Sequence, residues 1–373
     1  MSSGSTPFAG FAPCADGRGT RLGLGGAPLG NLFAPVSDDE ARALLAAAWD
    51  SGCRSFDTAP HYGHGLSEHR IGEALRAREA GSAGAPATST TTSAAAPTSA
   101  APPTTRERFV LSSKVGRLLV PDAQVPREQH GFVGGLPFRQ HWDYSAAGVR
   151  RSVEDSLQRL GLAWLDVAFV HDCDAGTHGA LAAAVRRQVL AEALPALREL
   201  QRAGLVRAVG LGVNDVRIVV DVLREADLDV LLLAGRYSLL DHAALAEALP
   251  LCAARGVRVA LGGVFNSGLL ATGTRAEGGE SGAARFDYAA AARPWVERTA
   301  RIEAVCDRHG VPLRAAALQF ALAHPAVDLV FVGARSAAEW HDALAMVGHP
   351  VPPAFWQALR ASDLLPAEAP TPA

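Results

Sequence analysis

The chain has 373 residues, of which 49% are hydrophobic, and a formal net charge of -3 at pH 7. That length suits one large barrel or two smaller domains, and the composition allows a sizeable buried core. Lysine and arginine are scattered among acidic residues, so no basic stripe suggests nucleic-acid binding. The five cysteines lie far apart and match neither a zinc site nor a disulfide framework, which indicates buried thiols in a reducing compartment.

The N-terminal residues contain no basic segment followed by an apolar run, so they do not predict a signal peptide. No apolar run reaches the roughly 20 residues that are needed to cross a bilayer. We therefore expect a soluble, cytoplasmic protein with no membrane partner. The sequence leaves its oligomeric state open.

In chain order, eight short β-rich runs alternate with amphipathic helices rich in Ala, Leu and Arg. The runs are mostly continuous apolar segments, which is typical of strands buried on both faces. They cover Arg21–Gly26, Arg54–Asp57, Phe109–Lys114, Asp166–His171, Val206–Val213, Asp229–Leu233, Val257–Gly262 and Asp328–Gly333.

Capping signals mark several of the helices. The first is expected to begin with a capping box at Ser37–Glu40 and to end at Gly52, a suitable left-handed cap. Helices over Ala146–Leu160 and Ala191–Ala203 are each followed by a glycine in the same way.

Residues 81–105 stand apart because they are almost wholly Ala, Ser, Thr, Pro and Gly. Such a segment cannot bury enough apolar surface to offset the entropy lost on ordering it. The periodic pattern resumes directly afterwards. We therefore predict a disordered surface insert within one domain that spans residues 1–373, with a barrel at about 21–347.

Eight strand–helix units in this length predict a (β/α)₈ TIM barrel. The competing fold is a doubly wound open sheet, which usually has a GxGxxG turn after its first strand. Here Gly23-x-Gly25 is followed by Pro28 where the third glycine should stand. That departure disfavours the open sheet.

Polar residues follow the ends of four neighbouring strands. Asp57, Lys114 and His171 end the second to fourth runs, Asn214 directly follows the fifth, and Tyr62 follows Asp57 closely. Active sites of such barrels form at the C-terminal ends of the strands. Each residue also has a structural alternative: a helix cap, a paired lysine, a core histidine or a packing tyrosine. The set is more specific than any member.

Together these residue types suit proton transfer to or from a weak acid. A free tyrosine has a pKa of about 10, and a nearby ammonium favours its phenolate. We therefore expect Lys114, held by Asp57, to lower the pKa of Tyr62. His171 is expected to orient the substrate oxygen. The hydride must pass to or from a cofactor, because side chains cannot carry it.

The sequence resembles the aldo-keto reductase family from Arg21 to about Val347. The resemblance rests on motifs that include Phe56-Asp57-Thr58-Ala59-x-x-Tyr62-Gly63, Ser113-Lys114, Val170-His171-Asp172 and Gly210-x-Gly212-Val213-Asn214. It implies that Asp57, Tyr62, Lys114 and His171 are the catalytic tetrad, with Tyr62 the general acid/base. It also implies that Asn214 holds the carboxamide of a nicotinamide cofactor.

Further segments resemble the branch of the family formed by D-threo-aldose 1-dehydrogenase (L-fucose dehydrogenase) and pyridoxal 4-dehydrogenase. They include Lys114–Leu119, Leu233–Leu240 and Gly262–Gly268. The resemblance implies oxidation of the C1 carbinol of an aldose to an aldonolactone. Alternatives are oxidation of pyridoxal, reduction of small aldehydes, and a cofactor-binding regulatory subunit without turnover.

The resemblance also implies cofactor contacts from Phe265, Ser267, Arg335, Ser336 and Glu339. Glu339 stands where many relatives have a basic residue that pairs with the 2′-phosphate of NADP, which favours NAD over NADP. Arg335 is an argument for NADP instead, because an arginine can bind a phosphate.

Many members of the family that the sequence resembles have a tyrosine on the seventh strand that stacks on the nicotinamide, and that position is Gly262 here. What covers the nicotinamide face is therefore open.

Three further residues are candidates for the substrate pocket: His61, Trp142 and Tyr237. Trp142 and Tyr237 have packing alternatives that the sequence does not exclude. His61, His64, His69 and Glu68 also invite a zinc interpretation, but their spacing fits no common site. We expect no metal.

Overall fold

The computed structural model describes residues 10–11, 20–83, 105–274 and 284–372. Eight parallel strands close into a barrel in the order β1-β12-β9-β8-β7-β6-β3-β2. Their bounds are β1 (Leu22–Gly25), β2 (Ser55–Asp57), β3 (Val110–Val115), β6 (Leu165–His171), β7 (Val206–Val213), β8 (Val230–Ala234), β9 (Arg258–Gly262) and β12 (Val327–Gly333). Every predicted β-rich run forms one of these strands, which confirms the (β/α)₈ barrel.

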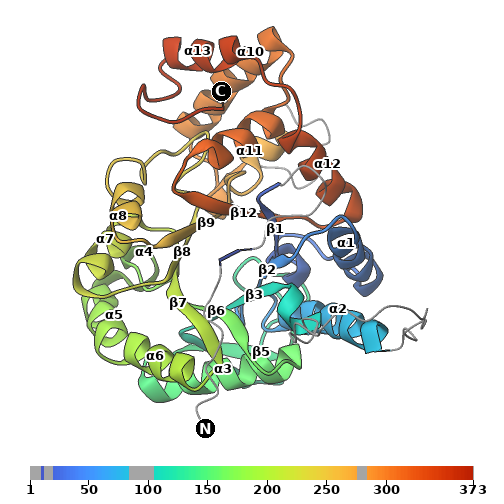
Figure 1. Cartoon of the computed structure of the whole chain (residues 1–373), viewed down its shortest axis with the longest axis vertical. Helices are drawn as coiled ribbons and strands as arrows, with labels where there is room; N and C mark the ends of the chain where they lie inside the picture. Colours follow the sequence, from blue (N-terminus) through green and yellow to red (C-terminus); the bar gives the residue numbers. More distant parts are fainter. Residues whose placement is uncertain (1–9, 12–19, 84–104, 275–283, 373) are drawn as a thin grey trace, which may run out of the picture.

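Helices surround the barrel (Figure 1). They are α1 (Asp38–Asp50), α2 (Leu66–Ala83), α3 (Ala146–Leu160), α6 (Leu194–Arg202), α7 (Val216–Glu225), α8 (Ala248–Ala254), α11 (Leu313–Ala323) and α12 (Ala337–Val347). Helices α10 (Arg293–His309) and α13 (Pro353–Ala361) pack together, and α13 follows residue 347, the predicted limit of the barrel. Shorter helices are α4 (Ala175–His178), α5 (Ala182–Gln188) and α9 (Leu269–Thr272).

Two small hairpins project from the loops of the barrel. The first, β4 (Arg117–Pro121) with β5 (Phe138–Trp142), follows β3 directly. The second, β10 (Arg285–Phe286) with β11 (Ala289–Ala290), lies between β9 and α10. Both hairpins therefore follow the C-terminal ends of strands, where the candidate site lies.

The helix starts and stops follow the expected capping chemistry, with one difference. Ser37 and Glu40 form the predicted capping box of α1. Gly161 ends α3 in a left-handed conformation. The helix expected from residue 191 instead begins with a π-turn over residues 189–193, and α6 follows with Pro195 in its first turn. Proline has no N–H to donate, so the regular hydrogen bonding is interrupted there.

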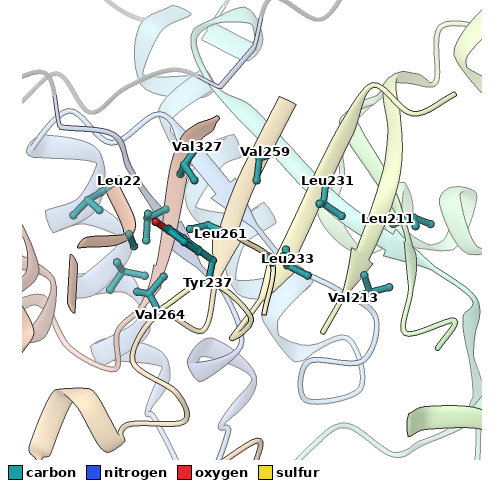
Figure 2. Packing of buried hydrophobic residues seen from close by; sticks show 14 of the residues in the cluster. Leu22, Leu211, Val213, Leu231, Leu233, Tyr237, Val259, Leu261, Val264 and Val327 are labelled. Atoms are coloured by element: carbon teal, nitrogen blue, oxygen red, sulfur yellow. The ribbon is translucent and has the colours of Figure 1, made fainter. Parts of the chain in front are cut away.

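Alternate residues of the strands build two apolar layers. The inner layer fills the barrel with side chains of Val167, Phe169, Ala208, Val230, Leu232, Ala260, Leu329 and Phe331. The outer layer packs under the helices, and Figure 2 shows Leu211, Val213, Leu231, Leu233, Val259 and Leu261 within it. Gly210 on β7 has no alternative, because a Cβ there would lie 1.9 Å from the backbone oxygen of Val230.

The predicted insert at 81–105 is described only at its edges. Helix α2 runs to Ala83, and a 3₁₀ turn begins at Thr105, so both ends belong to ordered elements. Residues 84–104 lie outside the described residues. Within the described ranges, no helix combines the length and apolar character needed to span a membrane.

Candidate active site

Four expected catalytic residues lie at one edge of the barrel. Strand β2 ends at Asp57, β6 ends at His171, and Lys114 is the residue before the end of β3. Tyr62 lies in the loop between β2 and α2. Because β3 pairs with both β2 and β6, the structure brings these four side chains to a common rim.

Lys114 and Asp57 form a buried ion pair. Lys114 Nζ donates to Asp57 Oδ2 at 2.7 Å and to the backbone oxygen of Thr58 at 2.9 Å. Ser112 Oγ donates to the other carboxylate oxygen at 2.7 Å. Burial raises the pKa of Asp57, and Lys114 opposes that rise.

Close backbone packing fixes the loop that carries Tyr62. A Cβ at Gly30, in the turn after β1, would lie 2.4 Å from the Tyr62 carbonyl carbon. Gly63 has a φ of 63°, which glycine adopts without strain. Thr58 Oγ1 donates to Ser67 Oγ at 2.9 Å, which ties the start of the loop to α2. Gly30 and Gly63 therefore allow the close packing that positions Tyr62.

Tyr62 lies between the ammonium and the imidazole. Lys114 Nζ is 4.7 Å from the centroid of its ring, and the His171 ring centroid is 6.2 Å away at 85°. Its hydroxyl makes no hydrogen bond to any described residue, so the oxygen is available to a substrate.

The pKa of Tyr62 does not follow the expectation. Burial raises the pKa of Tyr62 well above 10, and the carboxylates of Asp57 and Asp172 raise it further, while Arg117 acts in the opposite direction. The predicted lowering by Lys114 and Asp57 is wrong for the protein alone, because desolvation of the phenolate outweighs the nearby cations. Tyr62 is therefore held as a neutral acid.

His171 is held neutral and fixed in place. Burial lowers the pKa of His171 well below 6.5, and the positive charges of Arg117 and Lys114 lower it further. The Tyr144 hydroxyl donates to the backbone oxygen of His171 at 2.7 Å. A neutral imidazole keeps both a donor and an acceptor nitrogen, which suits it to orient a substrate hydroxyl or carbonyl.

The sequence reasoning assigned no role to Arg117, which connects three loops of this rim. Arg117 Nη1 donates to His61 Nδ1 at 2.7 Å and to Gln140 Oε1 at 3.2 Å, and Nη2 pairs with Asp172 Oδ2 at 2.5 Å. The guanidinium carbon lies 4.0 Å from the centroid of the Trp142 ring. Both Arg117 and Asp172 stand within the quoted motifs, one to three residues after the strand ends that were considered.

Two of the three pocket candidates, His61 and Trp142, lie in this network. The His61 ring is 5.8 Å from the His171 ring and 5.0 Å from the Phe132 ring, centroid to centroid. Trp142 is 38% exposed at the end of β5 and stacks on Tyr144 at 5.8 Å. Phe132, from the loop between β4 and β5, was not expected at the site.

The third pocket candidate, Tyr237, lies elsewhere. Its ring is 1% exposed, stacks on Phe320 of α11 at 5.0 Å, and lies among Leu261 and Val264 (Figure 2). This position in the outer apolar layer favours the packing alternative over a pocket wall.

Asn214 follows β7, and its side-chain amide makes no hydrogen bond to a described residue.

The expected cofactor residues follow β9 and β12. Phe265 packs against the core, and Ser267 Oγ accepts a hydrogen bond from the backbone N–H of Tyr288 at 2.9 Å. Ser336 caps α12 by accepting from the backbone N–H of Glu339. Glu339 in turn accepts from the Arg335 backbone at 2.8 Å and pairs with its guanidinium at 3.2 Å, both side chains being about half exposed.

Within the described ranges, no group of three or more His, Cys, Asp or Glu residues is arranged to hold a metal ion. Members of the histidine-rich segment have other partners instead. Glu68 binds Arg159 Nε at 2.5 Å and accepts from Ser113 Oγ at 2.8 Å. His61 accepts from Arg117.

Known proteins resemble this chain over nearly its full length. Residues 21–363 match the aldo/keto reductase family. The chain is 42% identical to pyridoxal 4-dehydrogenase of Microbacterium luteolum, covering 93% of this chain and 94% of the relative. It is 37% identical to D-threo-aldose 1-dehydrogenase of a Pseudomonas species, covering 92% and 94%.

Solved structures support the same fold. The aldo-keto reductase AKR11C1 from Bacillus halodurans, in its holo form, superposes with a TM-score of 0.64 at 22% identity, covering 94% of this chain and 93% of its own. At that identity the likeness bears on the barrel alone. The family match and the two relatives go further: this protein belongs to the aldo/keto reductase family, whose members are NAD(P)-dependent oxidoreductases acting on CH–OH groups.

Proposed function

We propose that this protein oxidises the hemiacetal carbinol of an aldose, of the D-threo or L-fucose type, to an aldonolactone. The observation that carries the proposal is the arrangement of Tyr62 between Lys114 and His171. The 37% identity to a D-threo-aldose 1-dehydrogenase supports the substrate class. The polar side chains around Arg117 suit a substrate with several hydroxyl groups.

The side chains divide the work of moving a proton. Tyr62 is the group that exchanges the proton with the substrate oxygen, as acid in reduction and as phenolate base in oxidation. Neutral His171 hydrogen-bonds the same oxygen and orients it. Asp57 holds Lys114 against the Tyr62 ring, so a positive charge stands beside the phenol that exchanges the proton.

The loops beyond β7, β9 and β12 fit a nicotinamide dinucleotide. Asn214 has an uncommitted amide that can hold a carboxamide. Gly262 leaves space at the end of β9, since a Cβ there would meet nothing closer than 3.7 Å. Phe265 and Ser267 lie on the next loop, and Ser336 opens α12. When bound, the nicotinamide ring accepts or supplies the hydride.

We further propose that NAD is preferred to NADP. Glu339 already neutralises Arg335, the nearest candidate for binding a 2′-phosphate. A carboxylate at this position repels a phosphate dianion and can accept hydrogen bonds from a ribose diol. The pairing of Arg335 with Glu339 at the start of α12 supports the preference.

A second candidate substrate is pyridoxal. The 42% identity to a pyridoxal 4-dehydrogenase favours it. Its aldehyde lies beside a hydroxymethyl group and closes to a cyclic hemiacetal, so the reacting carbinol resembles C1 of an aldose. The same four residues would act on either carbinol.

The test measures cofactor absorbance with purified protein, each oxidised cofactor, a panel of aldoses, pyridoxal and small aldehydes. We expect the largest kcat/KM for an aldose with NAD. A larger value for pyridoxal would move the proposal to the second candidate. Binding of cofactor with no turnover of any compound would contradict both and favour a regulatory subunit.

A further inference from the structure

Asp172, the residue after His171, adopts a backbone conformation that is uncommon for a residue other than glycine. Its φ is +45°, in the left-handed region that favours glycine. Its backbone N–H donates to the Gly212 oxygen at 3.1 Å, and Arg117 Nη2 binds its carboxylate. Such strain persists only where the surroundings enforce it, and it concentrates at functional sites.

Among the described residues, only one oxygen of the Asp172 carboxylate has a partner. Oδ2 binds Arg117 and lies 3.4 Å from His171 Nε2. Oδ1 makes no hydrogen bond to any described residue, and the side chain is 20% exposed. A strong acceptor therefore stands open beside the imidazole that orients the substrate oxygen.

Another ion pair on the same strand shows what a purely structural carboxylate looks like. Asp166, near the opposite end of β6, is 3% exposed, and its two oxygens are both used. Oδ2 accepts from Arg106 at 2.8 Å and from the Leu111 backbone at 2.9 Å, and Oδ1 accepts from Arg207 at 3.3 Å. Asp172 differs because half of its carboxylate is unused.

We infer that Asp172 is a specificity-determining residue whose Oδ1 accepts a hydrogen bond from the substrate hydroxyl on the carbon next to the reacting carbinol. For an aldose this is the C2 hydroxyl, so the inference rests on the proposed function. Arg117 is the positioning residue that fixes the carboxylate. A carboxylate prefers donor hydroxyls and disfavours an anionic phenolate, so the contact selects a polyol over pyridoxal.

The test is a cycle of two changes, Asp172→Asn in the protein and removal of the C2 hydroxyl from the sugar. A hydrogen bond to a charged group predicts that each change alone lowers kcat/KM by about tenfold to a hundredfold. If both changes remove the same contact, kcat/KM for the 2-deoxy sugar will be nearly the same with Asp172→Asn as with the parent protein. Calorimetric binding of the two aldonolactones to the cofactor complex should show the same non-additivity.

If the fold-losses in kcat/KM of the two single changes instead multiply when the changes are combined, the inference is overturned. Asp172 would then act only through His171. Failure of the proposed function looks different, because the parent protein would then not oxidise the sugar at all. Asp122→Asn is the matched control, since Asp122 forms a partly exposed ion pair with Arg139 in the β4–β5 hairpin that also carries Arg117. It should leave kcat/KM unchanged.

Arg117→Lys tests the positioning role. Lysine keeps the charge but cannot bind His61, Gln140 and Asp172 together. We expect KM for the full sugar to rise about tenfold while KM for the 2-deoxy sugar changes little. An equal rise for both sugars would contradict the positioning of Asp172 by Arg117. The melting temperature of each variant separates these effects from loss of folding.

Discussion

The two sides of the barrel mouth are built differently. Around β2, β3 and β6, Asp57 and Lys114 are at most 5% exposed along their side chains and form a short ion pair. Around α12, Arg335 and Glu339 are about half exposed, and their pair is longer, at 3.2 Å. The first side carries the proposed proton transfer, and the second carries the proposed choice of cofactor.

The difference shows where each kind of specificity can be changed. A buried pair cannot lose one partner without leaving an uncompensated charge, so changes on the chemical side are costly. Exposed charges are screened and contribute little to stability. Changes on the cofactor side should therefore alter selectivity while the fold is retained.

The largest expected effect belongs to Tyr62. Tyr62→Phe removes the only hydroxyl in the proposed proton path, and a positioned acid or base contributes about 10²–10⁴-fold to the rate. We expect kcat to fall by that factor while cofactor affinity, measured by fluorescence titration, stays the same. Turnover equal to that of the parent protein would remove Tyr62 from the mechanism.

Lys114→Met should affect stability as well as rate. The substitution leaves Asp57 buried with the Ser112 hydroxyl as its one remaining side-chain partner among the described residues, which costs about 3–5 kcal/mol. Chemical denaturation measures the loss. As a control on the exposed side, Arg335→Met should change the free energy of unfolding by less than about 1 kcal/mol. Similar losses for the two variants would contradict the contrast drawn between the two sides.

The pH dependence follows from the direction of the Tyr62 pKa. Because that pKa is raised above 10, Tyr62 is protonated at neutral pH and must lose its proton before it can act as a base. We expect kcat/KM for oxidation to rise steadily from about pH 6 to about pH 10. His171, whose pKa is lowered, should produce no acid limb near 6.5. A flat profile across this range would show that the proton leaves by another route.

Much of the fold, and part of the site, follows from the sequence. Continuous apolar runs mark all eight strands, and the strand-end rule selects Asp57, Lys114 and His171. That rule considers only the residues at which strands end, so it assigned no role to Asp172 or Arg117, which lie one and three residues further on. Their side-chain directions depend on a strained φ and on a hairpin that no periodicity encodes.

Burial explains the remaining differences. The sequence motifs identify the charged neighbours of Tyr62, and from these neighbours its pKa was expected to fall. The burial that raises the pKa depends on how the loops pack, which the motifs do not show. The sequence did not decide whether Tyr237 lines the pocket or packs in the core. Its ring lies against Phe320 because of the position of α11, which the sequence pattern does not give.

The smallest expected effect concerns Glu339. Glu339→Gln keeps an oxygen that can accept from the Arg335 backbone but removes the charge that neutralises its guanidinium. We expect kcat/KM with NADP to rise about fivefold relative to NAD, which corresponds to about 1 kcal/mol for an exposed charge. Steady-state kinetics with both cofactors measure the ratio. An unchanged ratio would show that Glu339 does not determine the preference.

The central claim is hydride removal from the hemiacetal carbon at the Tyr62 rim. The most direct measurement uses an aldose deuterated at C1, with the product and the cofactor followed by NMR. We predict one aldonolactone for each cofactor reduced, transfer of the deuterium to the nicotinamide, and loss of both signals in Tyr62→Phe. Reduced cofactor that carries no deuterium, or lactone formed equally by Tyr62→Phe, would contradict the account.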